Sequence, residues 1–323
     1  MKMINDYGLS ASTYKKELMG ISMIMVLLCH MPVIPITILN IFTPGMIGCD
    51  IFIFLSGYSL GYSLQKNSLA KFYVRRMARI YPLFLIMAIL KCLIIYNFVK
   101  PLSFWEVING FTLLSYYTNL GGVVVDWYLS ICFLFYLLFP LLFMVPRNIL
   151  IMLAIIGMTV VQILYSQDII LIKDNLACGL ARFPMFCWGI WLFKTIENQS
   201  RFSRNDMLIH FFWILPLSLA IVFKCHFYYI CDLVAPYLLL LLIYICQALK
   251  RKCITVSSFL NRLGNYTLEI YIANIISYTY CRYLAADKVM PISVTLIGGT
   301  IILSLLLIRA NVFIQKRLRP LTQ

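Results

Sequence analysis

Apolar stretches of about 20 residues follow one another along almost the whole chain. They run approximately over residues 18–36, 46–64, 80–98, 127–145, 148–166, 176–194, 207–224, 232–249, 263–282 and 289–309. A helix needs about 20 predominantly apolar residues to cross the hydrocarbon core of a bilayer. A helix also satisfies its own backbone hydrogen bonds there. The sequence therefore predicts an all-α integral membrane protein with about ten transmembrane helices.

The composition supports a membrane protein. Of the 323 residues, 62% are hydrophobic and only 12% are charged, and the mean hydropathy of +0.90 lies far outside the range of soluble domains. No polar stretch is long enough to fold separately, so we expect one membrane domain over residues 1–323. The eleven cysteines are scattered, mostly within apolar stretches and without a C-x-x-C motif, which predicts neither a metal site nor a disulfide framework.

The net charge of +15 has an explanation in membrane topology. With a cytoplasmic N-terminus, 20 of the 27 lysines and arginines fall in cytoplasmic segments. Five others fall in outer loops, namely Lys100, Lys173, Lys224, Arg282 and Lys288. The remaining two, Lys91 and Arg182, lie within spans. Cytoplasmic loops of membrane proteins carry such an excess of basic residues. We therefore expect both termini in the cytoplasm and no nucleic-acid partner.

His30 and Asp50 are ionisable residues inside predicted spans, where such residues are costly and often functional. His30 lies about 12 residues, or ~18 Å, into the first helix, and Asp50 lies about four residues, or ~6 Å, below the outer end of the second. Tilt and side-chain reach could bring them together, and the carboxylate would then orient the imidazole as a general base. The alternative is a purely structural pair.

Three arginines stand at the cytoplasmic start of the third helix, in KFYVRRMARIYP. Arg76 and Arg79 are three residues apart and share a helical face, and Arg75 adjoins them. Guanidinium groups at this spacing suit a phosphorylated ligand that arrives from the cytosol. The alternative is an anchor for anionic lipid headgroups.

Several motifs together resemble the acyltransferase-3 family of bacterial membrane acyltransferases. GMIGCDIFIFLSGY is followed by F-Y-x-x-R-x-x-R-I-x-P, the most specific of them, at Phe72–Pro82. WYLSICFLFYLLFPLL, ARFPMFCWGIWL and RLGNYTLEIYIANI are similar to later segments of the family. The helix that ends in His30 resembles the family's catalytic helix, so the resemblance spans the chain.

This resemblance implies transfer of an acyl group, commonly acetyl, from cytosolic acyl-CoA to a hydroxyl of a glycan or related acceptor at the outer face. His30 would be the general base, Asp50 its orienting partner, and Arg76 and Arg79, with Arg75, the contacts to the CoA phosphates. The acyl group could pass directly to the acceptor or first to His30. The location implied is the bacterial inner (cytoplasmic) membrane.

The chain departs from the family pattern in two segments. The family usually has an arginine eleven positions before the histidine, where this chain has Met19. Lys15 and Lys16, about one turn earlier, could supply the charge, although lysine lacks the planar fork of arginine. Many members also carry acidic residues after the W-x-L, where this chain has Cys132 and Phe133. These departures leave open a non-catalytic relative that binds a lipid.

Other residues in or beside the spans are candidates for substrate binding. Arg182 could bind a carboxylate of the substrate or pair with an acid, and Glu269 could be functional or structural. Trp127 could be an interfacial residue or a sugar platform, and the resemblance favours the site. Lys91 could snorkel or line the cavity.

The sequence thus predicts an acyl-CoA-dependent membrane O-acyltransferase. Its partners would be membrane lipid, acetyl-CoA as the donor, and an envelope polysaccharide or lipid-linked glycan as the acceptor. No metal is expected. The main rival is a transporter or flippase for glycans or lipid-linked sugars. The sequence leaves the acceptor, the acyl chain and the oligomeric state open.

Overall fold

The structure, a computed structural model, describes residues 11–31, 44–118, 126–166, 179, 181–197, 227–284 and 289–322. This part of the chain consists of helices and connecting turns and contains no strand. The helices are α2 (Lys15–Cys29), α4 (Pro44–Gln65), α5 (Leu69–Phe98), α6 (Phe104–Gly110), α7 (Ser115–Thr118), α8 (Trp127–Met144), α9 (Arg147–Ser166), α11 (Phe183–Glu197), α14 (Phe227–Lys252), α15 (Ile254–Asn265), α16 (Thr267–Leu284) and α17 (Val289–Thr322). The predicted all-α class is confirmed.

Four of these helices are long and apolar enough to cross a membrane. They cover Gly45–Gln65, Leu69–Phe98, Trp127–Met144 and Ser293–Pro320. The other predicted segments fall on helices that are shorter or less apolar, or that lie only partly within the described residues. The segment 207–224 lies wholly outside the described residues. A membrane protein is therefore supported, whereas the number of ten spans stays a prediction.

The first helix is shorter than its apolar stretch. Helix α2 ends at Cys29, and His30 is its C-cap residue, while the predicted span extended to residue 36. Pro32 explains this end, because proline disfavours helical conformation in the residue before it and cannot donate a backbone hydrogen bond. His30 thus stands at the end of a helix and not within one.

Helix α4 is the centre of the bundle and packs against α2 on one side and α11 on another. Its contact with α11 is very close. A Cβ atom added at Gly57 would lie 2.4 Å from the Phe186 carbonyl oxygen, and one at Gly189 would lie 2.2 Å from that of Phe54. Small residues allow such close approach between helices in a membrane. These glycines therefore fix the register between α4 and α11.

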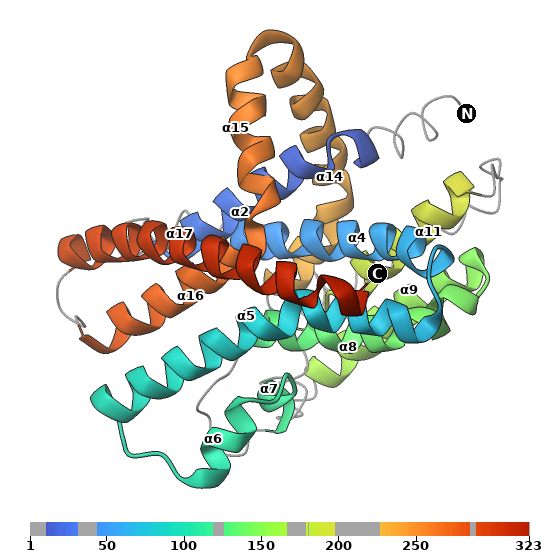
Figure 1. Cartoon of the computed structure of the whole chain (residues 1–323). Helices are drawn as coiled ribbons and strands as arrows, with labels where there is room; N and C mark the ends of the chain where they lie inside the picture. The colour runs from blue at the N-terminus through green and yellow to red at the C-terminus, as the bar shows by residue number, and fades with distance from the viewer. Residues whose placement is uncertain are drawn as a thin grey trace.

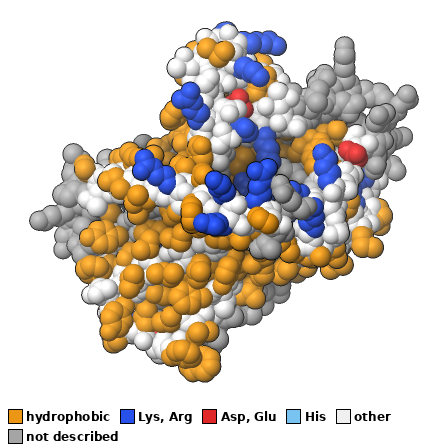
Figure 2. Space-filling model, viewed as in Figure 1, with side chains coloured by type: hydrophobic (Ala, Val, Ile, Leu, Met, Phe, Trp, Pro, Cys, Tyr) orange, Lys and Arg blue, Asp and Glu red, His pale blue; other side chains and the backbone are white. Residues whose placement is uncertain are grey.

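The remaining helices surround this centre (Figure 1). Helices α16, α17 and α5 pack against one another, and α16 also contacts α2. Helices α14 and α15 project from the bundle at the top of the view, and α15 packs across α2. Figure 2 shows lysines and arginines gathered over the upper and right part of this face, whereas its lower left is almost entirely hydrophobic. Basic and apolar side chains are thus separated on this face of the molecule.

Candidate active site

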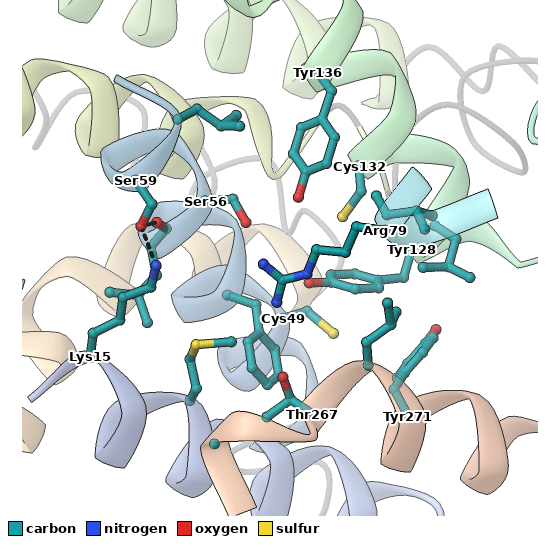
Figure 3. Close-up of a pocket in the computed structure, with 18 of the residues that line it drawn as sticks. Lys15, Cys49, Ser56, Ser59, Arg79, Tyr128, Cys132, Tyr136, Thr267 and Tyr271 are labelled. Atoms are coloured by element: carbon teal, nitrogen blue, oxygen red, sulfur yellow. Dashed lines mark hydrogen bonds between the residues drawn. The ribbon is translucent and has the colours of Figure 1, made fainter. Parts of the chain in front are cut away.

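One cavity of about 310 Å³ lies beside α5 and has basic residues of α2 and α5 in its wall. We name it the basic cavity, after Lys15, Lys16, Arg76 and Arg79 in its wall. Figure 3 shows Lys15 and Arg79 directed into it from opposite sides, with Ser56 and Ser59 of α4 nearby. The amine of Lys15 donates a hydrogen bond of 2.6 Å to the Ser59 hydroxyl. Residues from α2, α4, α5, α8, α15 and α16 thus build one pocket, in which charged and hydroxyl side chains lie among apolar ones.

The three arginines of the motif lie on two different faces of α5, as the geometry of a helix requires. Arg76 and Arg79, three residues apart, both line the basic cavity. The Nε atom of Arg76 is buried and has no hydrogen-bond acceptor among the described residues, so a ligand oxygen could satisfy it. Arg75 is exposed and donates to the side-chain oxygen of Asn67 at 2.8 Å. The structure therefore does not bring Arg75 to the other two.

The unusual residue Met19 lies in the wall of the same cavity. Lys15, four residues earlier, is one helical turn away on the same face. Its amine reaches the cavity and is held there by Ser59. Lys15 therefore places a further cation in the cavity that Arg76 and Arg79 line.

A second cavity of about 390 Å³ contains His30. We name it the histidine cavity. Its polar and aromatic wall residues include His30, Lys91, Asp126, Trp127, Tyr271, Tyr278 and Arg282. Val26, Cys49 and Tyr271 line this cavity and the basic cavity as well. The two cavities therefore adjoin each other through the interior of the bundle.

His30 is held by an amide and not by a carboxylate. Its Nδ1 atom lies 2.6 Å from the Asn274 side-chain oxygen, and the Asn274 amide nitrogen donates to the Thr300 hydroxyl at 3.4 Å. With the amide oxygen of Asn274 as the acceptor in this contact, Nδ1 of His30 carries the proton. The lone pair of the other ring nitrogen, Nε2, is then available to accept a proton.

The predicted contact between His30 and Asp50 is wrong. Asp50 is completely buried and pairs with Arg182, whose Nε lies 3.2 Å from the carboxylate. The cause is the packing of α4 on α2. Gly45 lies against Cys29, so Asp50 is five residues, or about 7.5 Å, further along α4 from the level of Cys29. Of the two alternatives for Arg182, pairing with an acid is confirmed.

Trp127 and Glu269 have different surroundings. Trp127 lines the histidine cavity, and its ring centroid lies 5.9 Å from the guanidinium carbon of Arg182. Glu269 lines neither cavity and accepts a hydrogen bond of 2.6 Å from the Asn311 amide. The structure therefore places Trp127 at the site and Glu269 in the contact between α16 and α17.

Sequence reasoning missed two residues that interact with His30. One is its hydrogen-bond partner Asn274. The other is Asp126 in the wall of the histidine cavity, whose carboxylate caps α8 through the Leu129 amide at 2.8 Å and accepts from the Tyr271 hydroxyl at 3.1 Å. Asp126 also interacts electrostatically with His30 and Lys91. Its position directly before Trp127, at the predicted outer end of a span, was an available signal. Asn274 gave no signal beyond being a polar residue in an apolar helix.

The sequence is similar to that of known acyltransferases. A family model described as an acyltransferase domain, that of acyltransferase 3, matches residues 18–309. The protein named "Acyltransferase MdmB" of Streptomyces mycarofaciens is 32% identical over 123 residues, which cover 35% of this chain and 32% of that protein. "Putative acetyltransferase ORF330" of Acidianus two-tailed virus is 26% identical over 207 residues, 62% of each chain.

The matches thus span about a third and somewhat under two thirds of these relatives' own lengths. No solved structure matches the chain. The family model, however, covers most of the sequence. The chain therefore belongs to the acyltransferase-3 family.

Proposed function

We propose that this protein is a membrane O-acyltransferase that uses cytosolic acyl-CoA, with acetyl as the acyl group. The acceptor is a hydroxyl of an envelope polysaccharide or a lipid-linked glycan on the other side of a bacterial inner membrane. Both termini would then face the cytoplasm. The family and the names of the relatives support the acyl transfer, and the predicted topology supports its direction.

The observation that carries this proposal is the pair of adjoining cavities. The basic cavity has four basic residues in its wall, Lys15, Lys16, Arg76 and Arg79, and the histidine cavity holds His30. Acyl-CoA has its phosphates at one end of a long, flexible arm and its thioester at the other. With its phosphates bound in the basic cavity, acyl-CoA would extend its arm along Val26, Cys49 and Tyr271, which line both cavities, and would place its thioester beside His30.

The donor side has the chemistry that phosphate binding needs. Guanidinium groups form charge-assisted hydrogen bonds with phosphate oxygens, and the buried Nε of Arg76 lacks an acceptor among the described residues. Lys15 contributes a point charge on the facing wall. The residues present therefore fit an anionic donor at this end of the path.

The acceptor side has a base with a defined tautomer. Nε2 of His30 would take the proton of the acceptor hydroxyl as its oxygen attacks the thioester carbonyl. As the carbon–sulfur bond breaks, His30 would return the proton to the leaving thiolate. If the acyl group passes first to His30, Nε2 is also the attacking atom. Both routes require Asn274 to hold the proton on Nδ1.

Substitution of the two cavity arginines tests the donor site. Arg76→Ala and Arg79→Ala should each raise the KM for acetyl-CoA roughly 10- to 150-fold, because a hydrogen bond to a charged group contributes about 1.5–3 kcal/mol. The measurement is release of the CoA thiol by purified protein in liposomes. Arg75→Ala is the matched control, because Arg75 lines neither cavity, and its KM should stay near that of the wild type.

If Arg76→Ala and Arg79→Ala keep the KM of the wild type, as Arg75→Ala is expected to do, the arginines serve as a lipid anchor. The same assay separates the enzyme from the rival transporter. A transporter would move glycan or lipid-linked sugar across the liposome membrane without releasing any CoA thiol, and that result would contradict the proposed function.

A further inference from the structure

One face of α16 forms a continuous wall of the histidine cavity. Tyr271, Ile275, Tyr278, Thr279 and Arg282 all line it, at the spacing of three and four residues that places side chains on one side of a helix. The ring of Tyr278 lies 5.1 Å from that of His30, centroid to centroid. This face therefore leads from the base His30 to the C-terminal end of α16.

Arg282 stands at that end of the wall, in the last turn of α16. It is exposed, and among the described residues no carboxylate forms an ion pair with it. The two other charged groups of the cavity, Lys91 and Asp126, are both buried and interact electrostatically with each other. Arg282 is therefore the positive charge of this cavity that an anionic ligand could bind.

The position of Arg282 matches the size of a sugar acceptor. From Asn274, the partner of His30, to Arg282 is eight residues, or about 12 Å of helix rise, and the long arginine side chain can reach back along it. Tyr278 lies between, and Tyr283 also lines the cavity. Aromatic rings offer apolar faces on which a sugar ring can pack.

From this arrangement we infer that the acceptor carries an oxyanion group, a carboxylate or a phosphate, which Arg282 binds while a hydroxyl lies at His30. The anionic group would be on the acylated sugar or on its neighbour. Arginine suits this task because its planar fork matches carboxylate and phosphate oxygens. The inference rests on the proposed function, since it assigns the acceptor's charge in the same site.

Ligand protection of Cys29 tests this inference without turnover. Cys29 lines the histidine cavity and is a half-buried free thiol, so its rate of alkylation reports occupancy. The probes are methyl glucoside, methyl glucuronide and glucose 6-phosphate, which share a ring and differ in charge. Alkylation of the Cys29 peptide in the full-length protein is followed by mass spectrometry.

Glucuronide, glucose 6-phosphate or both should protect Cys29 at concentrations about 10-fold lower than the neutral glucoside, and the stronger probe identifies the oxyanion. Added salt should reduce this preference. Arg282→Gln should abolish the preference for the charged probes, and Arg282→Lys should keep part of this preference. The control Arg309→Gln removes an exposed arginine that lines neither cavity and should keep it fully.

Equal protection by the three probes, absence of protection, or an unchanged preference in Arg282→Gln would overturn the inference. Arg282 would then only stabilise the C-terminal end of α16, where a positive charge is favourable. Failure of the proposed function looks different. In that case charged probes still protect Cys29, but no CoA thiol is released with any acceptor.

Discussion

His30→Gln is expected to lower ester formation by about 100-fold or more, while the protein still inserts and folds. Glutamine keeps a similar volume and a hydrogen-bonding end that can contact Asn274, but it cannot accept a proton at neutral pH. Loss of a positioned general base typically costs 10²- to 10⁴-fold in rate. The measurement is acetyl ester formed per minute at matched abundance of wild type and variant in the membrane.

Asn274→Ala is the companion to this variant, since it removes the acceptor that fixes the proton on Nδ1 of His30. The imidazole stays, so we expect a smaller loss, about 10-fold, which corresponds to one net hydrogen bond. Thr300→Val, which removes only the weak contact to the Asn274 amide, should cost less still. Wild-type ester formation by His30→Gln would show that this histidine is structural.

The second large effect is on folding and concerns the buried pair of Asp50 and Arg182. Both side chains are inaccessible to solvent, so removal of one leaves the other charge buried without its partner. Such a change costs about 3–5 kcal/mol. Asp50→Leu and Arg182→Met should therefore each lower the thermal stability and the membrane abundance of the protein strongly.

The double variant Asp50→Leu/Arg182→Met should recover most of the loss, because hydrophobic residues of similar volume can replace a buried ion pair. Glu106→Gln is the control. It breaks the exposed pair of Lys100 and Glu106 and should hardly change stability. If Asp50→Leu instead keeps the thermal stability of the wild type, the buried pair does not stabilise the fold, and this prediction is wrong.

Local patterns predicted the all-α class and the long apolar helices, and they predicted that Arg76 and Arg79 lie together. Hydropathy located the apolar helices, because a span must be long, apolar and internally hydrogen bonded. The three-residue spacing of Arg76 and Arg79 predicted a shared face, and both line the basic cavity. Arg75 was assigned to the same group by its charge alone, and its position on the helix places it at the surface.

Contacts between distant segments were not predictable from a single sequence. His30 meets Asn274 across 244 positions of the chain. The partner of Asp50 depends on the register of α4 against α11, which the close contacts at Gly57 and Gly189 set. A depth estimate along each helix gave a plausible partner for His30, but it could not say which helix faces which.

The end of α2 was missed for a different, local reason. The helix ends at Cys29, with His30 as its C-cap residue, because of the nearby Pro32, and a hydropathy pattern does not report the effect of a proline on a helix.

The most direct test of the central claim uses the sidedness of the reaction. Membrane vesicles from cells that produce the protein are prepared inside out and right side out, and radiolabelled acetyl-CoA, which does not cross the membrane, is added outside. Inside-out vesicles should incorporate label into base-labile esters of the glycan in their lumen. Right-side-out vesicles, and inside-out vesicles with His30→Gln, should incorporate little. Equal labelling of both vesicle types, or full labelling with His30→Gln, would contradict transfer across the membrane through this histidine.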